Sequence, residues 1–165
     1  MWNNIEEFTE WYLANGCPLK PPATDPIYET DHSLSCIVFR EGRYQVELYM
    51  LAPNWATPNH GHPGIEYRIV ILNGTIGGSK NNEYVNDSSE WADKANPDGT
   101  NVLFGMSFDF ESEDYHQVSV GPKGGLIAIT QKWDEGLAMS SQSVQYVGDP
   151  IGPHHETRIA VNKAE

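Results

Sequence analysis

Short apolar runs separated by turn residues constrain the fold of this chain more than any other feature. The runs have the length and composition of β-strands, and Gly, Asn or charged residues bound them. Tight turns are predicted at 40–43, at the Asn-Gly pair 73–74 and at the glycine-rich 121–125. Such a succession predicts an all-β sandwich or small barrel. The predicted strands span residues 35–39, 44–51, 66–72, 101–110, 116–120 and 125–133.

The N-terminal residues 1–16 have a helical pattern instead. Asn3 or Asn4 can cap the helix, acidic residues occupy its first turn, and Gly16 suits its end. The apolar residues recur at helical spacing and form one face. We therefore expect a helical arm packed on a barrel core of residues 35–133. The apolar face consists of Ile5, Phe8, Trp11 and Tyr12.

The length of 165 residues suits a single domain, 1–165. The polar segment 79–100 lies between strands of the same kind, so we expect a surface loop rather than a linker. Short strands are predicted near the C-terminus at 143–147 and 157–161.

Acidic residues outnumber basic ones by 23 to 10, for a net charge of −13. This charge repels phosphates and anionic lipids, so nucleic acid and membrane surfaces are not expected partners. The N-terminus has no signal-peptide pattern, and no apolar run approaches the roughly 20 residues of a membrane span. A cytoplasmic location is expected, with Cys17 and Cys36 as free thiols.

The stretch "TPNHGHPGIEYRIVILNG", residues 57–74, contains the candidate site. In an extended backbone, His60 and His62 point to the same side, so both imidazoles can reach one ion at about 2.0–2.1 Å. Glu66 adds a carboxylate, and His116 begins a later strand that can bring a third imidazole. These ligands suit iron, manganese, nickel, copper or zinc. The alternative is a polar surface turn with hydrogen-bonded histidines.

Two further residues are candidates for substrate binding. Arg68 has the same strand alternation as Glu66, so we expect both to face the interior, where Arg68 can hold a substrate carboxylate. The alternatives are a salt bridge to Glu66 or Glu47, or a bulge that turns Arg68 outward. Among the aromatic residues near strands, Trp133 is the first choice to line the pocket.

The pattern of His60, His62, Glu66 and Gly74, followed by the lone His116, resembles the cupin superfamily. The resemblance covers residues 44–133 and implies an antiparallel jelly-roll β-barrel, often dimeric, with a metal bound inside. The chain departs from the second cupin motif, since "ESEDY" lacks the usual proline and glycine before the histidine. The His-x-His-Pro-Gly pattern is similar to ChrR-type cupins, and the general layout is similar to thiol dioxygenases.

The resemblance implies a metal-dependent cupin enzyme, with a dioxygenase-type oxidoreductase acting on a small organic molecule as the leading hypothesis. Iron is the first choice of metal. Glu66 would either remain a ligand or detach to act as a base. A metal-dependent lyase or isomerase, and a non-enzymatic zinc- or ligand-binding sensor, remain as alternatives. A small-molecule substrate and a homodimer are the expected partners.

Overall fold

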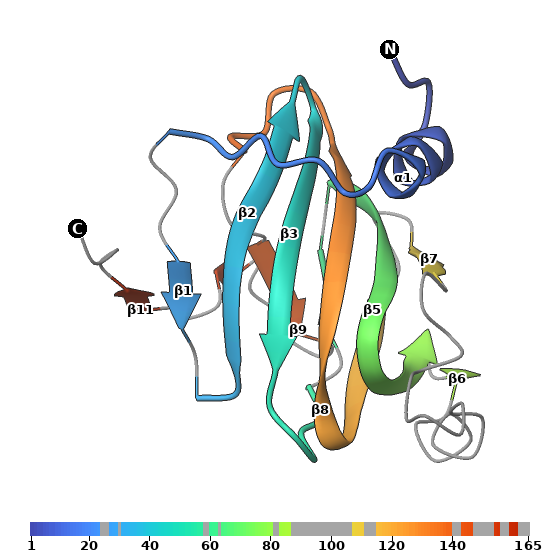
Figure 1. Ribbon diagram of the computed structural model, residues 1–165, viewed down its shortest axis with the longest axis vertical. Coiled ribbons are helices and arrows are strands. Elements are labelled where there is room, and N and C mark those ends of the chain that lie inside the picture. The colour runs from blue at the N-terminus through green and yellow to red at the C-terminus, as the bar shows by residue number, and fades with distance from the viewer. Residues whose placement is uncertain are drawn as a thin grey trace.

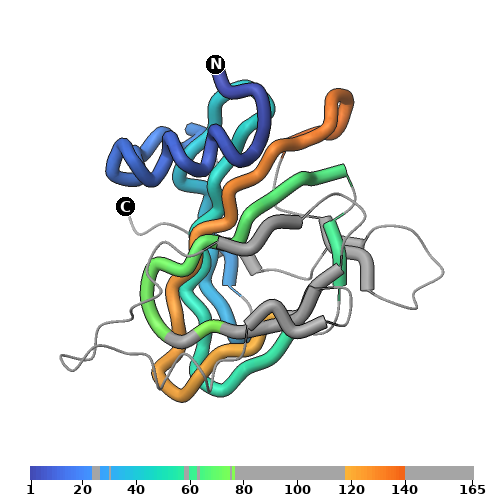
Figure 2. The backbone as a smooth tube through the Cα atoms, turned by 90° about the vertical axis from the view of Figure 1, so that its right-hand side faces the viewer, coloured from blue at the N-terminus to red at the C-terminus, as the bar shows by residue number. Residues whose placement is uncertain are grey.

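The part of the chain that the structure describes forms a curled antiparallel sheet with one helix on its outer side (Figures 1 and 2). The computed structural model describes side chains and backbone for much of the chain, and the backbone alone for several outer strands. The described residues are 1–23, 27–29, 31–57, 60–62, 64–80, 83–86, 107–110, 115–139, 143–146, 154–155 and 159–161.

Helix α1 (Ile5–Ala14) confirms the predicted arm. Asn4 is the N-cap, because its side chain accepts a hydrogen bond of 2.9 Å from the Glu7 amide. Phe8 and Tyr12 are buried against the sheet, and the hydroxyls of Thr9 and Thr130 hydrogen-bond at 2.6 Å. An apolar face and one buried polar contact therefore fix the helix on strand β8.

The first hairpin joins β2 (Ser33–Glu41) to β3 (Tyr44–Leu51). Its turn contains only Gly42 and Arg43, so the prediction of a turn at 40–43 was too wide. Arg40 lies in β2 opposite Gln45. A register shift between Ile37 and Phe39 interrupts the alternation of β2 side chains between the two faces of the sheet. Arg40 therefore lies on the same face as Gln45.

Two long strands, β5 (Ile65–Lys80) and β8 (Tyr115–Trp133), pair along their whole length. The predicted turns at 73–74 and 121–125 were wrong, because both strands continue through their glycines. Residues 121–124 of β8 lie opposite the single residue Thr75, between the pairs Gly74↔Gly125 and Ile76↔Val120. These glycines therefore form a bulge that bends the strands rather than a reversal of the chain.

The remaining strands complete an antiparallel sheet with the order β10-β9-β4-β8-β3-β2-β1-β11, and β5 pairs with β6, β7 and β8. The predicted all-β antiparallel architecture with an N-terminal helix is confirmed. Pairing among the described strands does not close into a ring. The shorter strands are β1 (Ile27–Glu29), β4 (His60–Gly61), β6 (Glu83–Asn86), β7 (Ser107–Phe110), β9 (Ser143–Tyr146), β10 (His154–His155) and β11 (Ile159–Val161).

The predicted loop 79–100 begins later than expected, since β5 and β6 form a hairpin across its first residues. Residues 87–106, which include most of that loop and the first part of the predicted strand 101–110, lie outside the described residues. Strands β9 and β11 confirm the short C-terminal strands. In the described part of the chain, no helix has the length and apolar character needed to cross a membrane.

The two faces of the sheet bury different clusters. The outer cluster lies under α1 and contains Phe8, Tyr12, Phe39, Tyr44, Val46, Val70 and Ala128. The interior cluster occupies the opposite face. Because adjacent strand residues alternate between the faces, the positions of β3, of 65–71 in β5 and of 126–133 in β8 can each be assigned to one face. The interior cluster contains Tyr49, Leu51, Ile65, Tyr67, Ile69, Ile71, Ile76, Val118, Val120, Ile127, Ile129 and Trp133.

We predict that Gly74→Ala destabilises the protein by roughly 2–4 kcal/mol. Gly74 has a φ of 88°, and an added Cβ would overlap the Gly124 carbonyl oxygen and lie 2.6 Å from the Gly125 Cα. Gly42→Ala is the control, because its φ of 58° is also positive but nothing lies within 4 Å of the added Cβ. It should cost about 1 kcal/mol. Urea unfolding measures both, and equal losses would contradict close packing at Gly74.

We predict that Tyr12 makes the fold sensitive to alkali. Burial, with a smaller contribution from Cys17, raises the pKa of Tyr12 from 10.0 to about 12. The unfolded chain therefore loses this proton first, and the stabilisation present below pH 10 is lost as the pH rises toward about 12. Tyr12→Phe should reduce the loss of unfolding free energy between pH 9 and 11.5, measured by urea titration. An unchanged pH dependence of the unfolding free energy in Tyr12→Phe would show that Tyr12 does not cause the sensitivity to alkali.

Candidate metal and substrate site in the sheet interior

The segment before β4 follows β8 closely and thereby positions the two histidines. The Val120 amide donates to the Trp55 carbonyl at 2.7 Å, and the Thr57 amide donates to Val118 at 2.9 Å. The Thr57 hydroxyl also accepts from the Val118 amide at 2.9 Å. The chain then enters β4 between β8 and β9.

The two histidine side chains lie together. The ring centres of His60 and His62 are 5.1 Å apart, with an angle of 87° between the ring planes. His62 is 3% exposed, whereas His60 is partly buried. The His62 ring also contacts the buried Tyr67 ring edge to face, at 5.0 Å. Since Tyr67 belongs to the interior cluster, the histidine pair adjoins the interior face of the sheet.

The backbone brings His116 beside this pair. His60 and His116 are direct partners in the antiparallel pairing of β4 and β8, although 56 positions separate them in the chain (116 − 60 = 56). The side chain of His116 lies outside the described residues. Among the side chains that the structure does describe, no three His, Cys, Asp or Glu lie close enough together to hold an ion.

A turn between β4 and β5 separates Glu66 and Arg68 from the histidines. The Ile65 amide donates to the His62 carbonyl at 3.2 Å, and Gly64 has a φ of 79°. This turn changes the alternation of the chain, so Ile65 and Tyr67 enter the interior cluster. Glu66 and Arg68 therefore occupy the outer face, contrary to the expectation that they face the interior.

The surroundings of both residues agree with this placement. Arg68 lies 3.8 Å from the carboxylate of Glu6, on α1. Burial, followed by the negative charges of Glu66 and Glu7, raises the pKa of Tyr44, a member of the outer cluster. Glu66 thus lies near the start of the helix, and the structure brings neither Glu66 nor Arg68 to the histidine pair.

Trp133 belongs to the interior cluster, and there it joins a polar network. Its Nε1 donates to Gln131 Oε1 at 2.8 Å, and Gln45 Nε2 donates to the same oxygen at 3.0 Å. Gln45 Oε1 accepts from Arg40 Nε at 2.8 Å. Gln131 Nε2 then donates to Glu47 Oε2 at a long 3.5 Å. The network connects three strands, and Gln131 is also the cross-strand neighbour of Tyr67.

The sequence analysis did not predict this network, because it selected candidate residues by their place in the histidine motif. The available signal was alternation, since Gln45 and Glu47 share a face with Tyr49 on β3. Gln131 lies between Ile129 and Trp133 in the same interior register of β8. Polar residues within a buried apolar series are informative, because burial is costly unless their hydrogen bonds are satisfied.

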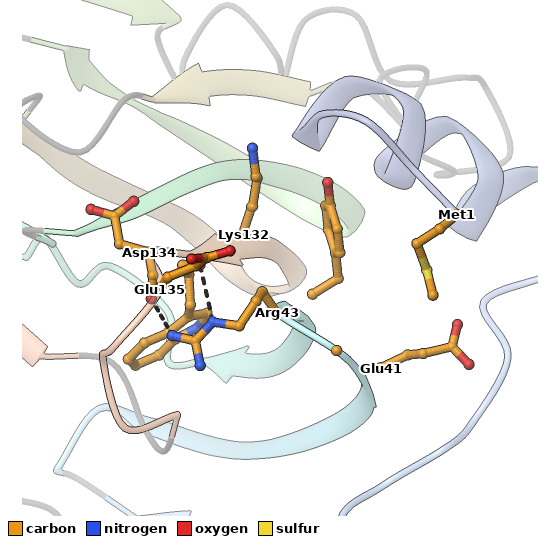
Figure 3. A pocket seen from close by; sticks show the side chains of 9 residues that line it. Met1, Glu41, Arg43, Lys132, Asp134 and Glu135 are labelled. Carbon is orange, nitrogen blue, oxygen red and sulfur yellow. Dashed lines mark hydrogen bonds between the residues drawn. The ribbon is translucent and has the colours of Figure 1, made fainter.

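A separate pocket of about 420 Å³ lies at the end of the sheet, beside the β2–β3 turn and the chain start (Figure 3). Arg43 closes one wall by donating to the carbonyls of Trp133, Asp134 and Leu137. Neither His60 nor His62 lines this pocket, so it is distinct from the histidine site. Its lining consists of Met1, Glu41, Gly42, Arg43, Tyr44, Lys132, Trp133, Asp134 and Glu135.

Solved structures define the class of fold. The cupin domain of Schizosaccharomyces pombe Cnp3 matches with a TM-score of 0.50 and 12% identity, over 65% of this chain and 68% of that one. Bacillus subtilis oxalate decarboxylase, whose structure concerns its Mn(II) centres, matches with a TM-score of 0.52 and 12% identity. That match covers 74% of this chain but only 31% of the decarboxylase.

These matches show a small antiparallel jelly-roll fold. The protein has the cupin fold, as its histidine motif indicated. No protein-family model and no curated sequence matches the chain. The complex of Rhodobacter sphaeroides SigE with ChrR also matches, at a TM-score of 0.42 and 16% identity, which is too low to assign a subfamily.

We predict that Gln131→Met destabilises the fold by roughly 2–4 kcal/mol. The substitution removes the Gln131 oxygen that accepts from Gln45 and Trp133, and it removes the Gln131 nitrogen that donates to Glu47. Lys132→Met is the matched control, since the neighbouring position faces the outer side and should change stability by less than about 1 kcal/mol. Urea unfolding measures the difference. Equal effects would show that the interior network contributes nothing.

Proposed function

We propose that this protein is a metal-dependent enzyme of the cupin fold, of dioxygenase type, acting on a small organic molecule. The observation that supports the proposal is the pair of imidazoles, His60 and His62, with ring centres 5.1 Å apart beside the interior face. His116 is proposed as the third ligand, on the basis of its backbone pairing with His60.

The spacing of the pair suits a shared ion. An imidazole nitrogen binds a transition metal at about 2.0–2.1 Å, so two adjacent imidazole ligands have ring centres roughly 4.5–5.3 Å apart. The observed separation lies within this range. Three neutral nitrogen ligands suit iron, and also manganese, nickel, copper or zinc. The bound metal would supply Lewis acidity and, for iron, a centre able to react with dioxygen.

The chain's own residues would shape the pocket and exclude water. Tyr67 contacts His62 and restricts the orientation of its ring. Trp133 and the aliphatic members of the interior cluster provide apolar walls, which suit a small organic substrate. Trp133 is held in place through Gln131, so it offers a fixed aromatic surface rather than a free indole donor. We keep Trp133 as the proposed substrate contact.

Neither Glu66 nor Arg68 has a place in this proposal, because both lie on the outer face. Without Glu66, three histidine ligands leave a position open even on four-coordinate zinc. An open position therefore does not require a metal that prefers five or six ligands. A lyase or isomerase would use the same open position without dioxygen, and oxygen consumption separates the two reactions.

Metal analysis of His62→Ala and His60→Ala tests the proposal. Wild-type protein, purified without added metal and then loaded with Fe(II) under anaerobic conditions, should hold about one ion per chain. Both variants should hold almost none while retaining the β-sheet circular dichroism spectrum. Glu66→Gln should bind as the wild type does. His32→Ala is the control, because His32 is exposed and its ring stacks on Trp55.

Oxygen uptake by the iron-loaded protein, measured with a panel of small organic acids, thiols and phenols, tests the oxygenase assignment. Stoichiometric iron with substrate-dependent uptake is the expected result. Turnover of a panel compound at the same rate without oxygen would replace the dioxygenase by the lyase or isomerase. Unchanged metal content in His62→Ala would refute the histidine site itself.

A further inference from the structure

Glu47 is the one buried carboxylate in the part of the chain whose side chains the structure describes. It is 0% exposed and lies on β3 in alternation with Tyr49 and Leu51, both members of the interior cluster. Its cross-strand neighbour on β8 is Ile129, which also belongs to that cluster. The carboxylate is therefore in the sheet interior, on the opposite face from α1.

Burying a carboxylate in apolar surroundings carries a large free-energy cost, which hydrogen bonds and nearby charge reduce. Gln131 Nε2 donates a hydrogen bond to Glu47 Oε2 at 3.5 Å, and Glu47 has at least one further interaction in the structure. A glutamine at position 47 would avoid the burial of charge with almost the same shape. Buried acids in such positions are candidates for a functional role.

The interior also contains His62, the one buried histidine among the described side chains. Tyr67 lies between the histidine pair and Glu47. The Tyr67 ring contacts His62, and the cross-strand partner of Tyr67, Gln131, donates a hydrogen bond to Glu47. Charges interact more strongly in such surroundings than in water, where the solvent screens them. In such surroundings a carboxylate can stabilise a divalent cation that it does not touch.

We propose that Glu47, rather than Glu66, supplies the negative charge of the interior site and stabilises a divalent cation held by the histidines without binding to it. This inference rests on the proposed metal site. Direct binding is not part of it, because Glu47 forms no group of three potential ligands among the described side chains. The role is electrostatic.

The test compares Glu47→Gln with Glu66→Gln. Both changes remove one negative charge with nearly unchanged shape, one from the interior face and one from the outer face. Co²⁺ affinity of the metal-free protein is measured by competition with a chromogenic chelator, and the visible spectrum of bound Co²⁺ reports its ligands. Glu47→Gln should weaken Co²⁺ binding at least about tenfold, and Glu66→Gln by less than about twofold. The cobalt spectrum should remain of the same type in both variants.

Glu47→Asp separates charge from packing, because it keeps the charge but shortens the side chain. The Co²⁺ affinity of Glu47→Asp should be within about threefold of the wild-type affinity. This variant therefore tests the inference even if Glu47→Gln fails to fold. A tenfold loss in Glu47→Asp, or wild-type affinity in a folded Glu47→Gln, overturns the inference and leaves the metal site intact. A cobalt spectrum showing one ligand fewer in Glu47→Gln also overturns it, because Glu47 would then be a ligand. Absence of Co²⁺ binding by the wild type refutes the proposed metal site and the inference with it.

Discussion

The antiparallel ladder between β5 and β8 is the constraint on which the rest of the fold depends. It fixes which residues of both strands face the interior, and it provides the edge along which β3 and β4 pair. Because β8 extends past the glycine bulge, its first residues reach β4, where His116 pairs with His60. One continuous strand thus joins the start of the candidate site to the interior network at Gln131 and Trp133.

The sequence was sufficient for the fold class, the N-terminal helix and the position of most strands, because each depends on local alternation, helical spacing or a cap such as Asn4. The prediction from sequence failed at glycines that suit either a tight turn or a bulge. Gly74 and the glycines of 121–125 are compatible with a reversal or with a bulge, and only the pairing of distant strands selects the bulge.

The candidate site could likewise be predicted from the sequence only in part. The closeness of His60 and His62 followed from their spacing of two residues, and the structure bears out that closeness. The orientation of Glu66 did not follow, because it depends on the hydrogen-bonded turn from His62 to Ile65. A change of one residue in alternation exchanges the two faces of a strand. Arg40 reaches the interior for a similar reason, through the register shift in β2.

The hydrogen bonds that connect Arg40, Gln45, Gln131 and Glu47 all point in one direction. Arg40 and Trp133 can only donate, so neither amide can turn over without losing a partner. Amide side chains do not pass protons along such a chain, and the arginine remains charged. The network therefore fixes the orientation of both amide groups, and it carries no proton between Arg40 and Glu47.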